Sequence, residues 1–153
     1  MPNTYTQIYI HIVFVVKGRA NLVAEKHREE LQKYITGIVS NRGQKLIAIY
    51  CMPDHTHVFV GLKPTINISD LTRDMKAGAS KFISDNKWIA GKFSWQEGFG
   101  AFSHSNDRVS IVANYIHNQK EHHAKKSFRT EYLELLKESD IEYDEKYLFE
   151  WID

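Results

Sequence analysis

The order of periodic segments along these 153 residues predicts an α+β fold, an antiparallel sheet with helices packed on one face. Three observations predict it. Apolar residues alternate in an opening strand, two strand-like segments meet at a Pro-Asp turn, and apolar residues at helical spacing recur between and after these strands. A hydrophobic content of 42% and a charged content of 25% are typical of one globular domain with a real core.

The first strand is predicted over residues 5–16, where every second residue is apolar and faces the same side. These inward residues are Ile8, Ile10, Ile12, Phe14 and Val16. A helix follows over about residues 25–42, with apolar residues at helical spacing, and Gly43 is a natural stop.

Residues 45–51 and 55–62 predict two strands joined by the Pro53-Asp54 turn. A second helix begins near Asn67 or Ser69, both of which are good helix caps.

The second half of the chain predicts a short fourth strand over residues 101–105. Asp107 is expected to cap a third helix that runs to about His123, and Ser127 to cap a fourth. The tail over residues 141–151 keeps six large apolar or aromatic residues, so we expect it to dock on the domain.

This order of elements is the split β-α-β order of ferredoxin-like domains, with an added C-terminal helix that carries a tyrosine. We expect one domain over residues 1–153, with a core over about 5–124 and a C-terminal helix and tail over 125–153. The helices would cover one sheet face and leave the other open for function. The open face would carry Tyr9, His11, His55 and His57.

The net charge of +1 does not indicate a nucleic-acid partner, so any such binding depends on local clusters of basic residues. The one cysteine, Cys51, rules out an internal disulfide, fits a reducing compartment, and is expected to be buried. No segment is apolar enough to cross a bilayer, and no signal-peptide pattern opens the chain. We therefore expect a cytoplasmic protein without a membrane partner.

His55 and His57 are separated by one residue in a predicted strand, so both point to the same sheet face. Two imidazoles held on one rigid face can share a divalent cation, although such pairs are often merely solvated. In the third helix, a stripe of polar residues runs beside the apolar stripe that is expected to face the core. A tyrosine and an amide that lie one turn apart in the polar stripe can reach a common point. The stripe consists of Tyr115, Asn118, Gln119 and His122.

Taken together, three motifs resemble those of the single-tyrosine HUH transposases of the insertion-sequence 200/605 type. They are His-x-His after Met-Pro-Asp, the segment from Trp95 to Ser103, and Tyr115-Ile116-His117-Asn118-Gln119 with Glu121-His122-His123. The resemblance runs from the opening strand through the helix with His122-His123. One departure is Thr56, because the family usually has a bulky apolar residue between its two histidines.

The resemblance implies that His55, His57 and Gln119 bind Mg²⁺ or Mn²⁺ and that Tyr115 is the nucleophile. It implies an enzyme that nicks and rejoins single-stranded DNA at hairpin-marked element ends through a 5′-phosphotyrosine. It also implies a homodimer, in which the tyrosine helix of one subunit can complete the site of the other.

Lower-ranked candidates for DNA contacts are scattered basic and polar residues, whose ordinary interpretation is a solvated surface. They are Lys17, Arg19, Arg73, Lys76, His11, Asn118 and His122. Two other functions stay open at this point: a non-catalytic module that binds single-stranded nucleic acid, and a nuclease of the replication-initiator or relaxase kind with the same histidine pair.

Overall fold

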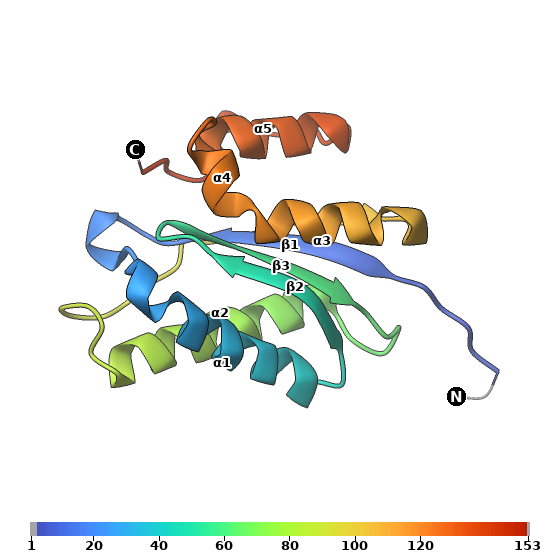
Figure 1. Cartoon of the computed structure of the whole chain (residues 1–153), viewed down its shortest axis with the longest axis horizontal. Coiled ribbons are helices and arrows are strands. Elements are labelled where there is room, and N and C mark those ends of the chain that lie inside the picture. Colours follow the sequence, from blue (N-terminus) through green and yellow to red (C-terminus); the bar gives the residue numbers. More distant parts are fainter. Residues whose placement is uncertain (1–2, 153) are drawn as a thin grey trace.

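The computed structural model describes residues 3–152 as a four-stranded antiparallel sheet between two layers of helices (Figure 1). The strands are β1 (Tyr9–Val15), β2 (Lys45–Cys51), β3 (His55–Gly61) and β4 (Gly100–His104). Their order across the sheet is β2-β3-β1-β4, and each neighbouring pair is antiparallel. The predicted ferredoxin-like fold is therefore confirmed.

One face of the sheet is covered by α1 (Arg28–Asn41) and α2 (Ile68–Asp85), which lie side by side below the strands in Figure 1. Their inward residues pack with alternate side chains of β1, including Ile12 and Phe14, in the main hydrophobic core. The apolar alternation of the first strand therefore faces these two helices, as predicted.

The opposite face is not open, and that prediction is wrong. α3 (Val109–His117), α4 (Gln119–His123) and α5 (Phe128–Glu138) form a second helical layer over it (Figure 1). The physical reason is that both faces of the central strands carry apolar residues that must be covered. Val112 and Ile116 of α3 pack against the sheet near β2 and β3.

Further along this face, α5 buries Phe128 and Tyr132 against Val13 and Val15 of β1. The tail packs into the same cluster, where Phe149 is 8% exposed, so the predicted docking of the tail is confirmed. The C-terminal helix and tail are thus part of the fold that covers the functional face.

Two of the three predicted caps are confirmed. The side chain of Asn67 accepts hydrogen bonds from the backbone N–H groups of Ser69 and Asp70 at the start of α2. The side chain of Ser127 accepts one from the N–H of Thr130 at the start of α5.

Several element boundaries differ from the prediction. β1 begins at Tyr9 instead of residue 5, and the helix predicted from residue 25 opens with a 3₁₀ turn, Glu25–His27, before α1. Asp107 lies within a 3₁₀ turn, Asn106–Arg108, and does not cap α3. The third helix is divided at Asn118, where φ is −99° and ψ is 23°, so that α4 leads from α3 towards α5 (Figure 1).

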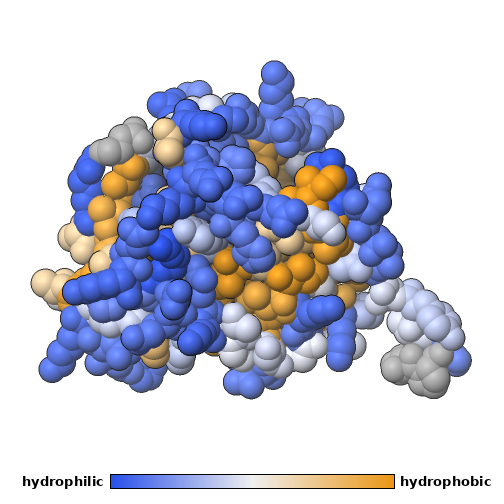
Figure 2. Space-filling model, in the orientation of Figure 1, coloured by the Kyte–Doolittle hydropathy of each residue, from blue (hydrophilic) through white to orange (hydrophobic). Residues whose placement is uncertain are grey.

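Figure 2 shows a mostly hydrophilic surface with apolar side chains reaching solvent between the two helical layers. No helix in the described part of the chain is both long and apolar enough to cross a membrane.

Candidate active site

β3 presents His55 and His57 to the face covered by the second helical layer, and both side chains have 0% exposure. Thr56 between them points the other way, because side chains alternate along a strand. It pairs with Phe14 of β1 and Cys51 of β2 in the sheet register. The threonine that departs from the family pattern thus leaves both imidazoles on one face.

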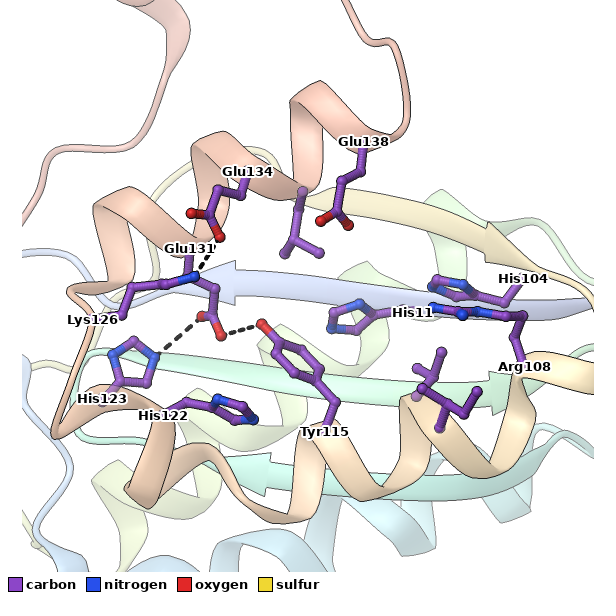
Figure 3. Close-up of a pocket in the computed structure, with 13 residues that line it drawn as sticks. His11, His104, Arg108, Tyr115, His122, His123, Lys126, Glu131, Glu134 and Glu138 are labelled. Carbon is purple, nitrogen blue, oxygen red and sulfur yellow. Dashed lines mark hydrogen bonds and ion pairs between the residues drawn. The ribbon is translucent and has the colours of Figure 1, made fainter.

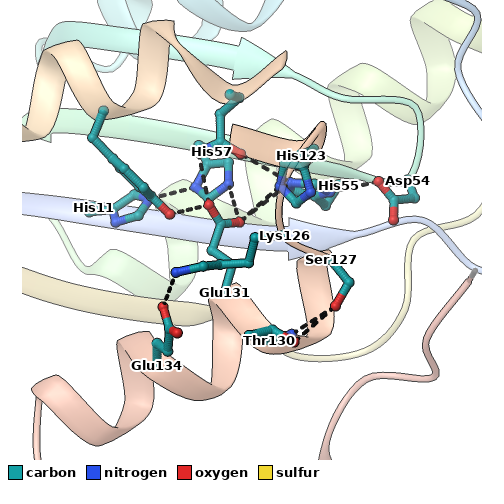
Figure 4. A network of polar contacts seen from close by, with 12 residues as sticks. His11, Asp54, His55, His57, His123, Lys126, Ser127, Thr130, Glu131 and Glu134 are labelled. Carbon is teal, nitrogen blue, oxygen red and sulfur yellow. Dashed lines mark hydrogen bonds and ion pairs between the residues drawn. The ribbon is translucent and has the colours of Figure 1, made fainter. Parts of the chain in front are cut away.

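Each of these imidazoles is oriented by a polar side chain that contacts its Nδ1 atom (Figure 4). Nδ1 of His55 lies 2.7 Å from Oδ1 of Asp54, and Nδ1 of His57 lies 2.7 Å from Nε2 of His11. The partners fix the ring planes and leave both Nε2 atoms directed into the space under α5, an arrangement that is common around metal-binding histidines.

Burial and neighbouring charges shift the pKa values of His55 and of the two orienting residues, His11 and Asp54. Burial, and then the nearby His57, lowers the pKa of His11 well below its ordinary value. Burial also lowers the pKa of His55, although its hydrogen bond with Asp54 opposes the shift. For Asp54, burial opposes ionisation, but the contact with His55 outweighs it and holds the pKa of this carboxyl below its usual range.

Two residues of the polar stripe in the third helix, Tyr115 and Gln119, lie beside the histidines. Gln119 is fully buried, and its Oε1 lies 3.5 Å from Nε2 of His55. The centre of the Tyr115 ring lies 6.0 Å from that of His57. His55 and Gln119, 64 residues apart in the sequence, therefore line one small space between β3 and the second helical layer.

Glu131 of α5 fills the centre of this space, and its two carboxylate oxygens face different partners. Oε2 accepts a hydrogen bond from the hydroxyl of Tyr115 (Figure 3). It accepts another, at 3.0 Å, from Nε2 of Gln119. The carboxylate thus joins the predicted nucleophile to the amide one turn away.

The other oxygen, Oε1 of Glu131, is surrounded by imidazole nitrogens. Nε2 of His123 lies at 3.1 Å, Nε2 of His57 at 3.3 Å and Nε2 of His55 at 3.9 Å. Glu131 is only 4% exposed, so solvent does little to stabilise its charge.

The charge of Glu131 and the proton of Tyr115 are coupled. Burial opposes ionisation of Glu131, but the hydrogen bond with His123 and the nearby imidazole of His57 outweigh it and hold the pKa of this carboxyl far below its usual range. Burial, and then the negative charge of Glu131, raises the pKa of Tyr115 well above its ordinary value. The phenol is therefore protonated near neutral pH and donates to an ionised carboxylate.

The donor set fits a divalent cation. One ligand atom each from His55, His57, His123 and Glu131 lies within 4.8 Å of all the others. Nε2 of His57 is buried without a hydrogen-bond partner among the described residues, although a carboxylate oxygen lies nearby. A buried carboxylate among three imidazoles favours a positive ion to balance its charge.

Sequence reasoning missed three members of this site. The sequence indicates Asp54 only as a turn residue, although it directly precedes the histidine that it orients. The sequence does contain a pattern that could have identified Glu131. It is an acidic residue inside the apolar stripe of the fourth helix, three positions after Phe128 and beside Tyr132. For His123 the sequence offers no signal that separates it from its neighbour.

The structure places the predicted DNA contacts at three locations. Lys17 and Arg19 are exposed just after β1. Arg73 is exposed on α2, across the sheet from Tyr115, and is paired with Asp70 and Asp74.

Lys76, also on α2, directs its Nζ to the backbone oxygens of Gln96 and Gly98, at 2.8 and 3.0 Å. Asn118 and His122 are exposed near Tyr115, and the ring centre of His122 lies 5.0 Å from that of Tyr115. His11 is 1% exposed and bonded to His57, so a role in orienting His57 replaces the predicted DNA contact.

The family model described as "Transposase IS200 like" matches residues 4–119 of this chain. The chain belongs to the IS200-like transposase family. It is 22% identical over 120 residues to ISDra2 transposase TnpA of Deinococcus radiodurans, covering 74% of this chain and 84% of that protein. The family match ends at Gln119, so His123 and Glu131 lie beyond it.

Solved structures agree on the fold. A candidate transposase from Deinococcus radiodurans R1 superposes with a TM-score of 0.61 at 20% identity, covering 76% of this chain and 94% of that one. A REP-associated tyrosine transposase bound to a REP hairpin superposes with a TM-score of 0.59 at 18% identity, covering 79% of this chain and 72% of that one.

Proposed function

We propose that this IS200-like transposase nicks and rejoins single-stranded DNA through a covalent 5′-phosphotyrosine on Tyr115. The observation that carries the proposal is the convergence of Tyr115 and Gln119 on the buried pair His55 and His57 within one chain. A hydrogen-bonded phenol beside a site suited to a divalent cation has the chemistry for transesterification at phosphorus.

In the proposed reaction, Oη of Tyr115 bonds to the scissile phosphorus while the bond from phosphorus to the 3′ oxygen breaks. Glu131 accepts the hydrogen bond of the phenol and orients Oη, the phenol proton passes to water, and the departing 3′ oxygen gains a proton. The new phosphotyrosine preserves the energy of the broken diester, so a second 3′-OH can reverse the step without ATP.

His55, His57 and Gln119 are the proposed ligands of the cation, and Glu131 offers a further oxygen in the same cluster. A bound Mg²⁺ or Mn²⁺ supplies Lewis-acid stabilisation of the charge that develops on the phosphate and on the leaving oxygen. Imidazole donors suit Mn²⁺ better than Mg²⁺, which prefers an all-oxygen shell.

Hairpin-bearing single-stranded DNA at the ends of a mobile element is the proposed substrate. The hairpin bound by the REP-associated relative supports this choice. A homodimer is proposed from the family resemblance, and β2 and β4 each have only one neighbour in the described sheet, which leaves an edge available for pairing. A cytoplasmic location stays a prediction.

Incubation with hairpin-bearing single-stranded oligonucleotides and Mn²⁺, followed by denaturing electrophoresis, tests the proposal. We expect a protein–DNA adduct that is lost in Tyr115→Phe and retained in Tyr147→Phe, which alters an exposed tyrosine outside the site. An adduct that persists in Tyr115→Phe contradicts the proposed nucleophile. Tight DNA binding without any adduct would favour the non-catalytic binding module instead.

A further inference from the structure

A cavity of about 270 Å³ opens between α3 and α5 beside the nucleophile (Figure 3). The side chain of Tyr115 forms part of its wall, with its hydroxyl at the Glu131 end. A phosphodiester joins two nucleosides, one on each side of its phosphorus. When Tyr115 attacks that phosphorus, one of the two nucleosides must therefore lie close to this cavity. The volume is near the lower end of ligand pockets, which hold about 300–1,000 Å³.

Part of the cavity wall is apolar and belongs to the outer surface of the second helical layer. Ile111 of α3 is 53% exposed and lines the cavity together with Val112 and Leu135. An apolar wall beside the flat ring of Tyr115 is a surface on which an unpaired base can stack.

Polar groups gather at the end of the cavity remote from Glu131. Arg108 and Glu138 line this end and make no side-chain hydrogen bond or ion pair with any other described residue. His104 lies beside them, and its Nε2 is buried without a hydrogen-bond partner in the described chain. Burial, and then Arg108, lowers the pKa of His104, so its imidazole is neutral near pH 7 and offers one donor and one acceptor.

We infer that this cavity is a subsite for one unpaired DNA base next to the phosphate that Tyr115 attacks. The inference rests on the proposed function and extends it to how the strand is held. A base fits better than a phosphate, because the carboxylates of Glu131, Glu134 and Glu138 outnumber the two cations in the lining, Arg108 and Lys126, and the excess negative charge disfavours an anion. The mixture of a guanidinium, a carboxylate and a neutral imidazole matches the donors and acceptors on the edge of a base.

The test measures DNA binding without chemistry, by fluorescence anisotropy in EDTA. Short labelled single strands, each made of one kind of base, are compared first. The strand that binds most tightly is then remade with one abasic nucleotide at each position in turn. The proteins are wild type, Ile111→Glu and the control Ile141→Glu. The control makes the same change at an isoleucine that is 40% exposed and lines a different groove.

We expect one abasic position to weaken binding to wild type about tenfold, the loss typical of one stacked base. Ile111→Glu should bind the intact strand about tenfold more weakly and lose its sensitivity to that position, whereas Ile141→Glu should behave as wild type. Glu138→Gln should change which of the four bases binds most tightly, because it replaces an acceptor at the polar end by a donor and an acceptor.

Equal losses at every abasic position, or equal binding by Ile111→Glu and Ile141→Glu, would overturn the base subsite. Circular dichroism of each variant checks that it is folded. The adduct assay with Tyr115→Phe reports separately on the proposed function: an adduct without a base-specific position contradicts only the subsite, and a base-specific position without an adduct contradicts only the transesterification.

Discussion

The hydroxyl of Tyr115 on α3 donates a hydrogen bond to Glu131 on α5 of the same chain. The bond links the helix that carries the proposed nucleophile to a helix outside the residues matched by the family model. It also places the phenol beside the histidines of its own sheet, so that one chain holds a full set of candidate groups.

This geometry predicts catalysis within one chain. A mixture of Tyr115→Phe and His57→Ala proteins should recover no nicking activity above that of either variant alone, because each chain pairs its own tyrosine with its own histidines. The measurement is adduct formation on denaturing gels after the two proteins are mixed and unfolded and refolded together. Recovery of a substantial fraction of wild-type adduct would show exchange of the tyrosine helix between subunits.

Loss of the Glu131 charge should weaken the link between α3 and α5. Glu131→Gln should lower the free energy of unfolding of the metal-free protein by about 2 kcal/mol, because hydrogen bonds to a charged group are replaced by weaker ones and two amide donors then face each other. Chemical denaturation measures it. The control is Glu134→Gln, one turn away and exposed, where the change should stay within about 0.5 kcal/mol. Equal effects would argue against a structural role for Glu131.

Mn²⁺ should stabilise the fold through the histidine pair. At a concentration 100 times the dissociation constant, a ligand that binds only the native state adds about 2.7 kcal/mol, which thermal unfolding readily detects. The stabilisation should vanish in the double variant His55→Ala, His57→Ala and persist in His117→Ala, which alters an exposed histidine of α3. Stabilisation that survives the double variant would place the ion elsewhere.

Asp54 should tune the affinity for the metal without touching it. Its carboxylate holds Nδ1 of His55, so Asp54→Asn should weaken Mn²⁺ binding by about 10–100-fold, the usual cost of removing an outer partner. Calorimetric titration measures the affinity, and Asp70→Asn on α2 is the control. An unchanged affinity would mean that the turn alone orients His55.

Burial raises the pKa of the Cys51 thiol to about 12, so the native protein should resist alkylation. Near pH 8, iodoacetamide should react on the order of a thousandfold more slowly with native than with unfolded protein, whose thiol has a pKa of about 8.5. Because the native state keeps its proton, Cys51 should lower stability as the pH rises from about 8.5 towards 12. Similar alkylation rates in the two states would contradict the burial of this thiol.

The sequence by itself determined the fold class, because periodicity is a local property. Alternation in the first strand, the Pro53-Asp54 turn and the caps at Asn67 and Ser127 each depend on residues near one another in the chain. The same is true of His55 with His57 and of Tyr115 with Gln119, whose spacing fixes their shared face in a strand or helix.

Only the tertiary structure decided what covers that face and completes the site. Both surfaces of a central strand can be apolar, and alternation does not say whether solvent or a further helix lies against the second one. Glu131 and His123 reach the histidines because α5 folds back over α3, a long-range contact set by the packing of Phe128 and Tyr132 on β1. No local pattern specifies such a contact, since its energy comes from surfaces that meet only in the folded chain.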